Sequence, residues 1–426
     1  MSLSDRSTTR PTGRAVPECS IARVVLGSSV METDRRECLT DAVPRILIAP
    51  DKFKGSLGAD AVAETLRDAL LARRPDLEVL TLPVADGGDG TLKAALAAGY
   101  EQVPVTVAGP TGEPVTSAYA RSGDVALVEL ADASGLTRLP GGRPCARTAT
   151  SRGTGELVAA ALDAGCRHIV LGIGGSACTD GGAGMVQALG ARLLDRDGAE
   201  IGPGGSGLAD LSVLDVSRLH PSLPDAEVIV ACDVDNPLTG PHGAAPVYGP
   251  QKGASTADVT ALDAALAHWA DVVTAATGVD LRESAGAGAA GGVGFAALSL
   301  LGARLSPGID LVLDLIGFHD LVGTADLVVV GEGSLDEQTL RGKAVAGVAT
   351  AGRAAGTRVV AVCGRCTLSD AQLQEVGIDA AYELLDLEPD PSVCMGDAGR
   401  LLGQLAERIL SGGHLPDEPA ALSDQH

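Results

Sequence analysis

The segment Arg45-Ile-Leu-Ile-Ala49, followed by Pro50-Asp-Lys-Phe-Lys-Gly-Ser56, decides the fold class of this chain. Its apolar half predicts a buried β-strand, and its polar, glycine-containing half predicts a loop. A helix should follow, because apolar side chains recur every four residues from Val62 to Leu70, and Leu77–Pro83 is the next apolar run. This strand–helix–strand unit predicts parallel strands of an α/β sheet, with ligand-binding loops at their carboxyl ends.

The later strand-like segments predict a second α/β unit inserted into the first. Val103–Ala108, Pro114–Ala120 and Val125–Leu130 are short β-like runs separated by turn sequences, which is typical of an antiparallel meander. Parallel-type strands return at Asp326–Val330 and Arg358–Cys363 and would complete the first sheet. We therefore expect a discontinuous parallel-sheet domain over residues 44–98 and 288–411, an inserted α/β domain over 99–287, and disordered segments over 1–43 and 412–426.

The composition excludes a nucleic-acid partner. The chain has 426 residues, a formal charge of −23 and only 2% aromatic residues, whereas nucleic-acid binding needs positive surface and aromatic stacking platforms. No apolar run reaches the ~18 residues of a membrane span, and the N-terminus has no signal pattern. Nine scattered cysteines favour a reducing compartment rather than a disulfide framework. These features predict a cytoplasmic protein with no membrane partner.

Two familiar motifs are present without the context that they need. Gly286-Ala-Gly-Ala-Ala-Gly291 matches the dinucleotide pattern GxGxxG, but the residues before it make a poor strand, which argues against NAD. A glycine-rich turn that opens a helix still offers N–H groups to an anion, so Gly288, Gly291 and Gly292 are candidate phosphate contacts. Cys363-Gly-Arg-Cys366 is a CxxC without a second pair or a nearby histidine, which disfavours a zinc or redox role.

The lysines are few and unevenly placed. The chain has 27 Arg but only five Lys, and four of the five lie in glycine-rich loops. Because a lysine ammonium binds a phosphate oxygen as a compact point charge, whereas arginine is a planar fork, the surviving lysines are candidates for chemistry. The four are Lys52, Lys54, Lys252 and Lys343.

Carboxylates recur in the same loops, at the ends of predicted strands. One such loop alone would be ordinary turn chemistry, but several together are not explained in that way. Carboxylates with few histidines favour Mg²⁺, and lysine with glycine N–H groups favours phosphate. Together these groups predict phosphoryl transfer. The carboxylates are Asp51, Asp86, Asp89, Asp180, Asp233, Glu332 and Asp336.

Six motifs, in order along the chain, resemble those of the type I glycerate kinases, and the resemblance runs from about Arg45 to Leu410. It implies ATP- and Mg²⁺-dependent phosphorylation of D-glycerate, usually at the 2-hydroxyl. It also implies a flavodoxin/Rossmann-like discontinuous domain, an inserted α/β domain and an active site in the cleft between them. The motifs are Ile48–Ser56, Ala85–Thr91, Gly172–Gly184, Ala231–Leu238, Gly249–Gly253 and Gly331–Thr339.

We assign hypothetical roles within this resemblance. Asp180 is the favoured general base and Asp233 its competitor, while Lys52 and Lys54 would neutralise anionic reactants. The expected metal ligands are Asp86, Asp89, Glu332 and Asp336. The expected substrate or phosphate contacts are Ser56, Gly174, Gly175, Ser176, Asn236, Lys252, Gly288, Gly291, Gly292 and Lys343.

Three positions depart from the family pattern, and several alternatives stay open. Thr179, Ser334 and Glu337 replace a common Asn, Arg and Ser, and the loss of that Arg removes a possible anion contact. The competing functions are a non-catalytic binder of small hydroxy acids, a kinase that acts on another hydroxy acid, and a kinase that yields 3-phosphoglycerate. A homodimer is also left open.

Overall fold

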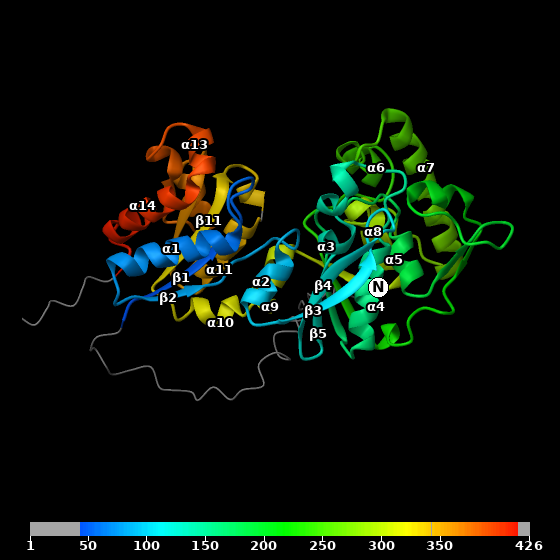
Figure 1. Ribbon diagram of the computed structural model, residues 1–426, viewed down its shortest axis with the longest axis horizontal. Helices are drawn as coiled ribbons and strands as arrows, with labels where there is room; N and C mark the ends of the chain where they lie inside the picture. Colours follow the sequence, from blue (N-terminus) through cyan, green and yellow to red (C-terminus); the bar gives the residue numbers. More distant parts are fainter. Residues whose placement is uncertain (1–42, 342, 416–426) are drawn as a thin grey trace, which may run out of the picture.

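The computed structural model describes residues 43–341 and 343–415, which form two α/β lobes side by side (Figure 1). Residues 1–42 of the extension predicted over 1–43, and residues 416–426 of the tail predicted over 412–426, lie outside the described residues. The first lobe is built on a five-stranded sheet and the second lobe on a six-stranded sheet. No helix in the described part of the chain has the length and apolar character to cross a membrane.

The first lobe has an all-parallel sheet in the order β13-β12-β11-β1-β2. Counted along the chain within this sheet, the order is 2-1-3-4-5, as in flavodoxin-like folds. The predicted fold class is confirmed, because β1 and β2 come from the N-terminal segment and the other three strands from late sequence. The bounds are β1 Arg45–Pro50, β2 Glu78–Thr81, β11 Leu327–Leu335, β12 Arg358–Cys366 and β13 Ala380–Glu383.

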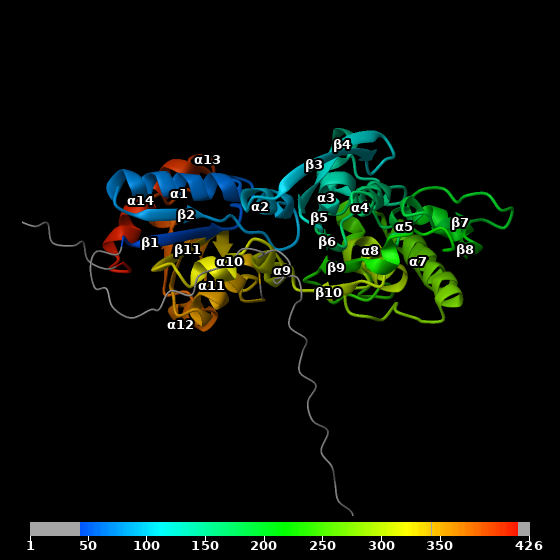
Figure 2. The same cartoon turned by 90° about the horizontal axis from the view of Figure 1, so that it is seen from below.

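Helices cover both faces of this sheet, as Figure 2 shows. Alternate residues of β1 point to opposite faces, so Ile46 and Ile48 pack in one core and Leu47 and Ala49 in the other. One face carries α1 (Ala59–Arg73), α13 (Pro391–Gly396) and α14 (Ala398–Ser411). The other face carries α9 (Gly308–Leu315), α10 (Phe318–Val322), α11 (Ala344–Ala354) and α12 (Asp370–Val376).

The second lobe has a mixed sheet in the order β10-β9-β6-β5-β4-β3, in which β4 alone runs opposite to the other five strands. The strands are β3 Glu101–Ala108, β4 Pro114–Ser122, β5 Val125–Glu129, β6 His168–Gly172, β9 Glu227–Ala231 and β10 Arg304–Ser306, with the separate pair β7 Arg192–Leu194 and β8 Val213–Asp215. The helices are α3 Leu130–Ser134, α4 Arg152–Asp163, α5 Ala183–Ala188, α6 Ala244–Tyr248, α7 Thr256–Thr277 and α8 Ala289–Leu300.

Two helices, α9 and α2 (Thr91–Ala97), contribute to the cores of both lobes. Ile309 and Val312 of α9 pack in the first lobe, whereas Leu311 and Leu315 pack on the second sheet. The Tyr100 hydroxyl, at the start of the second lobe, donates to the carbonyl oxygen of Leu315 at 3.1 Å. The lobes are therefore joined by a shared apolar layer as well as by the chain itself.

Two predicted boundaries are wrong. Residues 288–306 were expected in the first lobe, but β10 pairs with β9 and α8 packs in the second core, because a three-residue strand is placed by its partner. Residues 412–415 were expected in a disordered tail, yet His414 Nε2 lies 2.7 Å from the Tyr382 hydroxyl and Leu415 packs on the first core.

Candidate active site

The first half of the site lies where β1 and β11 end side by side. In the order 2-1-3-4-5 the connections leave these two strands toward opposite faces, which opens a crevice at their carboxyl ends. The Asp51 N–H donates to the Gly331 carbonyl oxygen at 2.8 Å and so joins the two loops. The predicted residues Lys52 and Lys54 follow β1, and Glu332 lies on the end of β11.

The carboxyl groups in this crevice hold protons unusually well. Burial, the largest cause, raises the pKa of Asp51 to about 6 and that of Glu332 to about 7. The Asp51 charge raises the pKa of Glu332 further, and the Asp86 charge raises that of Asp51. Lys343 and a hydrogen bond from the Thr339 hydroxyl favour ionised Glu332, but they offset only part of the cost of burial. The crevice is therefore short of positive charge.

Glu332→Gln is expected to change how stability depends on pH. The pKa of Glu332 is raised from 4.5 to about 7, so its contribution to stability is present below pH 4.5 and is lost as the pH rises toward 7. The variant should therefore lose less free energy of unfolding than the wild type between pH 5 and pH 8, as measured by urea denaturation. Glu337→Gln, at an exposed position nearby, is the control, and equal pH profiles for Glu332→Gln and wild type would contradict the prediction.

The loop after β2 contacts residues of both lobes. Lys52 Nζ lies 2.5 Å from the Asp89 carbonyl oxygen and 3.3 Å from Asp89 Oδ2. The same loop contacts the loop after β6, since a Cβ added at Gly174 would lie 2.5 Å from Gly88 Cα. The two loops therefore meet backbone to backbone. Predicted residues from both lobes are brought together here.

Gly174→Ala is expected to lower kcat/KM on the order of tenfold. Its methyl group would push the two loops apart. A displacement of reacting groups by ~1 Å lowers the rate by about 10²-fold, and we expect a smaller displacement here. Steady-state kinetics measures the loss. Gly202→Ala is the control, because nothing lies within 4 Å of an added Cβ there. Unchanged kcat/KM in Gly174→Ala would show that this contact does not set the active geometry.

Asp233 lies at the matching edge of the second lobe, two residues after the end of β9. Its Oδ1 accepts the Gly308 N–H at 2.7 Å, and the residue is exposed to solvent. Burial of part of the carboxyl raises its pKa, and the charges of Asp86 and Asp310 raise it further, whereas the Gly308 hydrogen bond opposes them. Asp86 thus interacts electrostatically with Asp51 of the first lobe and with Asp233 of the second.

Lys252 is not exposed to a ligand but holds the loop after β6 in place. It is 1% exposed, and its Nζ donates to Ser176 Oγ at 2.9 Å and to the Cys178 carbonyl oxygen at 2.5 Å. Burial lowers the pKa of this ammonium, and the nearby Cys178 and Asp180 partly oppose that effect. The loop leaves Gly175 exposed beside the buried Ser176.

The location of Asp180 contradicts its predicted role as general base. The residue is 0% exposed, and its carboxylate is surrounded by hydrogen-bond donors. Oδ2 accepts the Ser151 N–H at 2.8 Å, the Ser151 hydroxyl at 2.9 Å and the Gly184 N–H at 3.2 Å, while Oδ1 accepts the Gly182 N–H at 3.1 Å. A carboxylate held in this way stabilises loops and is not available to a substrate hydroxyl.

The predicted phosphate contacts of the glycine-rich turn are also wrong. Cβ atoms added at Gly288 and Gly291 would lie 2.1 and 2.2 Å from the carbonyl oxygens of Pro237 and Cys178, and one added at Gly292 would lie 2.7 Å from Gly181 Cα. These glycines are buried and permit close backbone packing. The turn also contains Ala290, the one non-glycine residue with positive φ, 52°, in the described part of the chain.

Two further predicted contacts are occupied by the protein itself. The Asn236 side chain donates to the His242 carbonyl oxygen at 2.8 Å and accepts the Tyr248 hydroxyl at 2.6 Å. The Ser56 hydroxyl donates to the Met395 carbonyl oxygen at 2.6 Å, which fixes the loop after β1 on α13. Both side chains stabilise loops at the site through hydrogen bonds within the protein, and these bonds do not go to a ligand.

Glu129 belongs to the site region but was not predicted from the sequence. It ends β5 as a 5% exposed residue, and its carboxylate accepts the N–H groups of Gly90 and Leu92 at 3.3 and 2.9 Å. Burial raises its pKa to about 6. It thereby ties the loop after β2 to the second sheet. The only signal was a charged residue at the end of an apolar run.

The four predicted metal ligands do not form a closed cage. Asp86 and Asp89 lie on the loop after β2, whereas Glu332 and Asp336 lie on the end of β11 and just after it. Among residues 43–341 and 343–415, no group of three His, Cys, Asp or Glu side chains is placed to hold a metal ion. Mg²⁺ is commonly bound by one or two carboxylates together with substrate phosphates and water, so these pairs fit a metal that arrives with a phosphate ligand.

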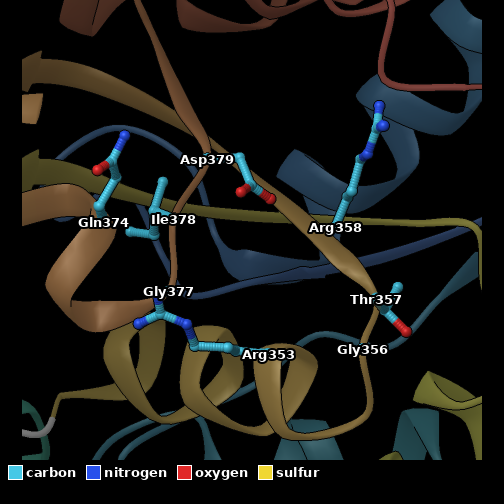
Figure 3. Close-up of a pocket in the computed structure, with 8 residues that line it drawn as sticks. All are labelled: Arg353, Gly356, Thr357, Arg358, Gln374, Gly377, Ile378 and Asp379. Carbon is cyan, nitrogen blue, oxygen red and sulfur yellow. The ribbon is translucent and has the colours of Figure 1, made fainter.

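A separate hollow of about 240 Å³ lies at the opposite end of the first sheet (Figure 3). Arg353 and Arg358 line it, but their guanidinium groups point apart. Each donates to a main-chain carbonyl oxygen, that of Glu375 at 3.2 Å and that of Gly413 at 3.0 Å. The hollow therefore offers no convergent anion site and contains none of the predicted residues.

The fold and the charged loops define an α/β phosphotransferase whose two lobes present the carboxyl ends of parallel strands to each other. Residues 46–412 match the model of the glycerate kinase family. The chain is 46% identical to the glycerate kinase of Bacillus subtilis over 344 residues, or 80% of this chain and 90% of that protein. It belongs to the glycerate kinase family.

Two further comparisons support this membership. The chain is 44% identical to the glycerate 2-kinase of Escherichia coli over 345 residues, which cover 80% of this chain and 90% of that one. A crystal structure assigned to glycerate kinase 2 of Salmonella typhimurium LT2 has a TM-score of 0.75 and 41% identity, and the match covers 87% of this chain and 99% of that one. The resemblance noted in the sequence is confirmed.

Proposed function

We propose that this enzyme transfers the terminal phosphoryl group of ATP to the 2-hydroxyl of D-glycerate, giving 2-phosphoglycerate and ADP. The observation that carries the proposal is the meeting of the two strand-end regions through the loop after β2. This loop pairs with Lys52 on one side and contacts the Gly174 loop on the other. A phosphate donor on the first lobe and a small acceptor on the second lobe would then face each other.

Asp233 is the proposed general base in place of Asp180. It is exposed, it follows a strand of the second lobe, and the structure gives its Oδ2 no hydrogen bond within the described residues. Asp233 would accept the proton of the glycerate hydroxyl as that oxygen bonds to the γ-phosphorus and the bond to the ADP oxygen breaks. Lys52 and Lys54 would neutralise the phosphate oxygens, and the proton would leave Asp233 to solvent.

Mg²⁺ is proposed to accompany ATP. Its ligands would be drawn from Asp86, Asp89, Glu332 and Asp336, together with phosphate oxygens. Bound there, the ion would neutralise charge that develops on the transferred group. The carboxylates gathered in the crevice, whose charges add to burial in raising the pKa of Asp51 and Glu332, support a site that accepts a divalent cation.

One assay separates this function from a non-catalytic binder and from a kinase that yields 3-phosphoglycerate. ATP, Mg²⁺ and D-glycerate are mixed with the enzyme, ADP release is followed by a coupled reaction, and the product is identified by ³¹P NMR. ADP release with a 2-phosphate signal supports the proposal, and a 3-phosphate signal supports the other regiochemistry. Glycerate binding without ADP release would show a non-catalytic binder. The cytoplasmic location and the homodimer stay predictions.

A further inference from the structure

We infer that Arg365, which nothing in the motif analysis assigned to the site, binds the phosphate oxygens of the nucleotide. This inference rests on the proposed function, because it names the residue that would hold the phosphate donor. Arg365 lies near the end of β12, directly beside Ser334 of β11 in the parallel register. Its side chain is exposed at the same end of the sheet as Lys52 and Glu332.

The orientation of the Arg365 side chain is fixed by its neighbour. Arg365 Nε donates to Ser334 Oγ at 3.0 Å, so the guanidinium lies over the end of β11. Ser334 Oγ in turn donates to Asp336 Oδ2 at 3.4 Å. The guanidinium therefore lies beside the strand end that carries Glu332 and Asp336.

The remaining donors of Arg365 have no protein partner. Within residues 43–341 and 343–415, the structure shows neither an ion pair nor a hydrogen bond from either Nη atom, although Glu332 and Asp336 belong to the same strand end. Other arginines of the chain do pair with nearby carboxylates, as Arg45 does with Glu78 at 2.7 Å. A guanidinium that is held through Nε and whose two Nη atoms have no protein partner can donate two parallel hydrogen bonds to phosphate oxygens.

The charge balance of the crevice favours the same conclusion. Three carboxyl groups lie beside the place where a polyphosphate would bind, those of Asp51, Glu332 and Asp336. The Lys343 ammonium donates a hydrogen bond to Gln338 Oε1 at 2.8 Å. Arg365 supplies a permanent positive charge on the β12 side of β11. In a sheet of the order 2-1-3-4-5, nucleotides bind at this end, which is why we assign the fork to a nucleotide phosphate and not to the glycerate carboxylate.

Arg365→Ser tests the inference by direct binding. Isothermal titration with MgADP should show a 10–100-fold increase in Kd, the usual effect of losing hydrogen bonds to a charged group, while Kd for D-glycerate stays within twofold. Arg365→Lys, which keeps the charge but not the fork, should fall between Arg365→Ser and wild type. Arg67→Ser, a change at a half-buried residue on α1 that removes the same charge, is the control.

A charge-swap variant tests the location of the guanidinium. Because residues 334 and 365 are paired across β11 and β12, Ser334→Arg combined with Arg365→Ser should restore most of the ADP affinity. Failure of this rescue in a protein with wild-type thermal stability would overturn the placement. So would ADP binding within twofold of wild type in Arg365→Ser, or a selective loss of glycerate binding.

The outcomes distinguish this inference from the proposed function. If wild type binds MgADP and Arg365→Ser does not, Arg365 is a nucleotide ligand whether or not D-glycerate is the acceptor. If wild type releases ADP with D-glycerate and Arg365→Ser binds MgADP normally, the proposed function stands and the inference fails.

Discussion

An Asp233→Asn variant is expected to lower kcat by about 10²–10⁴-fold, the usual range for a general base. The amide cannot accept the hydroxyl proton, but it keeps the shape of the carboxylate and its oxygen can still accept the Gly308 N–H. Thermal stability and KM for ATP should therefore change little. Coupled measurement of ADP release, with thermal unfolding in parallel, gives all three quantities.

Asp235→Asn is the matched control for this prediction. Asp235 lies two residues away on the same exposed loop, and the same change of charge should leave kcat within threefold of wild type. If Asp233→Asn retains more than a fifth of the wild-type kcat, Asp233 is not the base. Equal losses in both variants would indicate a general effect of loop charge.

Asp180→Asn is expected to reduce the free energy of unfolding by about 3 kcal/mol. The buried carboxylate accepts hydrogen bonds from Ser151, Gly182 and Gly184, and an amide nitrogen would face donors that it cannot satisfy. Bonds to a charged group contribute about 1.5–3 kcal/mol each, and an unsatisfied buried donor adds its own desolvation cost. Urea denaturation at neutral pH measures the difference.

The control for Asp180→Asn is Asp197→Asn, a change at an exposed turn that should move the unfolding midpoint very little. Activity of Asp180→Asn should fall only in proportion to the fraction unfolded at the assay temperature. A variant as stable as wild type, with kcat lowered 10²-fold or more, would return Asp180 to the role of base.

The sequence predicted the first lobe well where the signal was strong and local. The apolar run from Ile46 to Ala49 is buried on both faces, as expected for a central parallel strand, and the helix through Val62 and Leu70 formed as its spacing indicated. The boundary near residue 288 was missed because β10 has only three residues, and its place is decided by hydrogen bonds to β9. Pairing between strands that are far apart in the chain leaves no pattern in the local sequence.

The candidate site was predicted as a set of loops more accurately than as a set of roles. Lys52, Asp86 and Asp233 do lie at strand ends that meet. Asp180 and Lys252 were misjudged because residue type shows what a side chain can do but not whether the fold buries it. The sequence around an aspartate among glycines is the same whether its carboxylate accepts main-chain N–H groups or faces a substrate.

The CxxC motif contains a residue to which we assign a role, but that residue is not one of its cysteines. Cys363 Sγ donates to the Tyr382 carbonyl oxygen at 3.8 Å and Cys366 Sγ to that of Leu368 at 3.6 Å, and both thiols are free. The residue that acquires a chemical role in our inference is Arg365, between them. Its relation to Ser334 exists only once β11 and β12 are paired, so it could not be found by reading the chain.

The placement of β1 beside β11 has a consequence for how the protein is made. When β1 leaves the ribosome it can pair with β2 at once, but its other edge has no partner until residues 327–331 are translated. At about 5–20 residues per second that wait is on the order of tens of seconds, during which the second lobe can fold completely. An unpaired apolar strand edge invites aggregation, so chaperone dependence should be concentrated in this interval of synthesis.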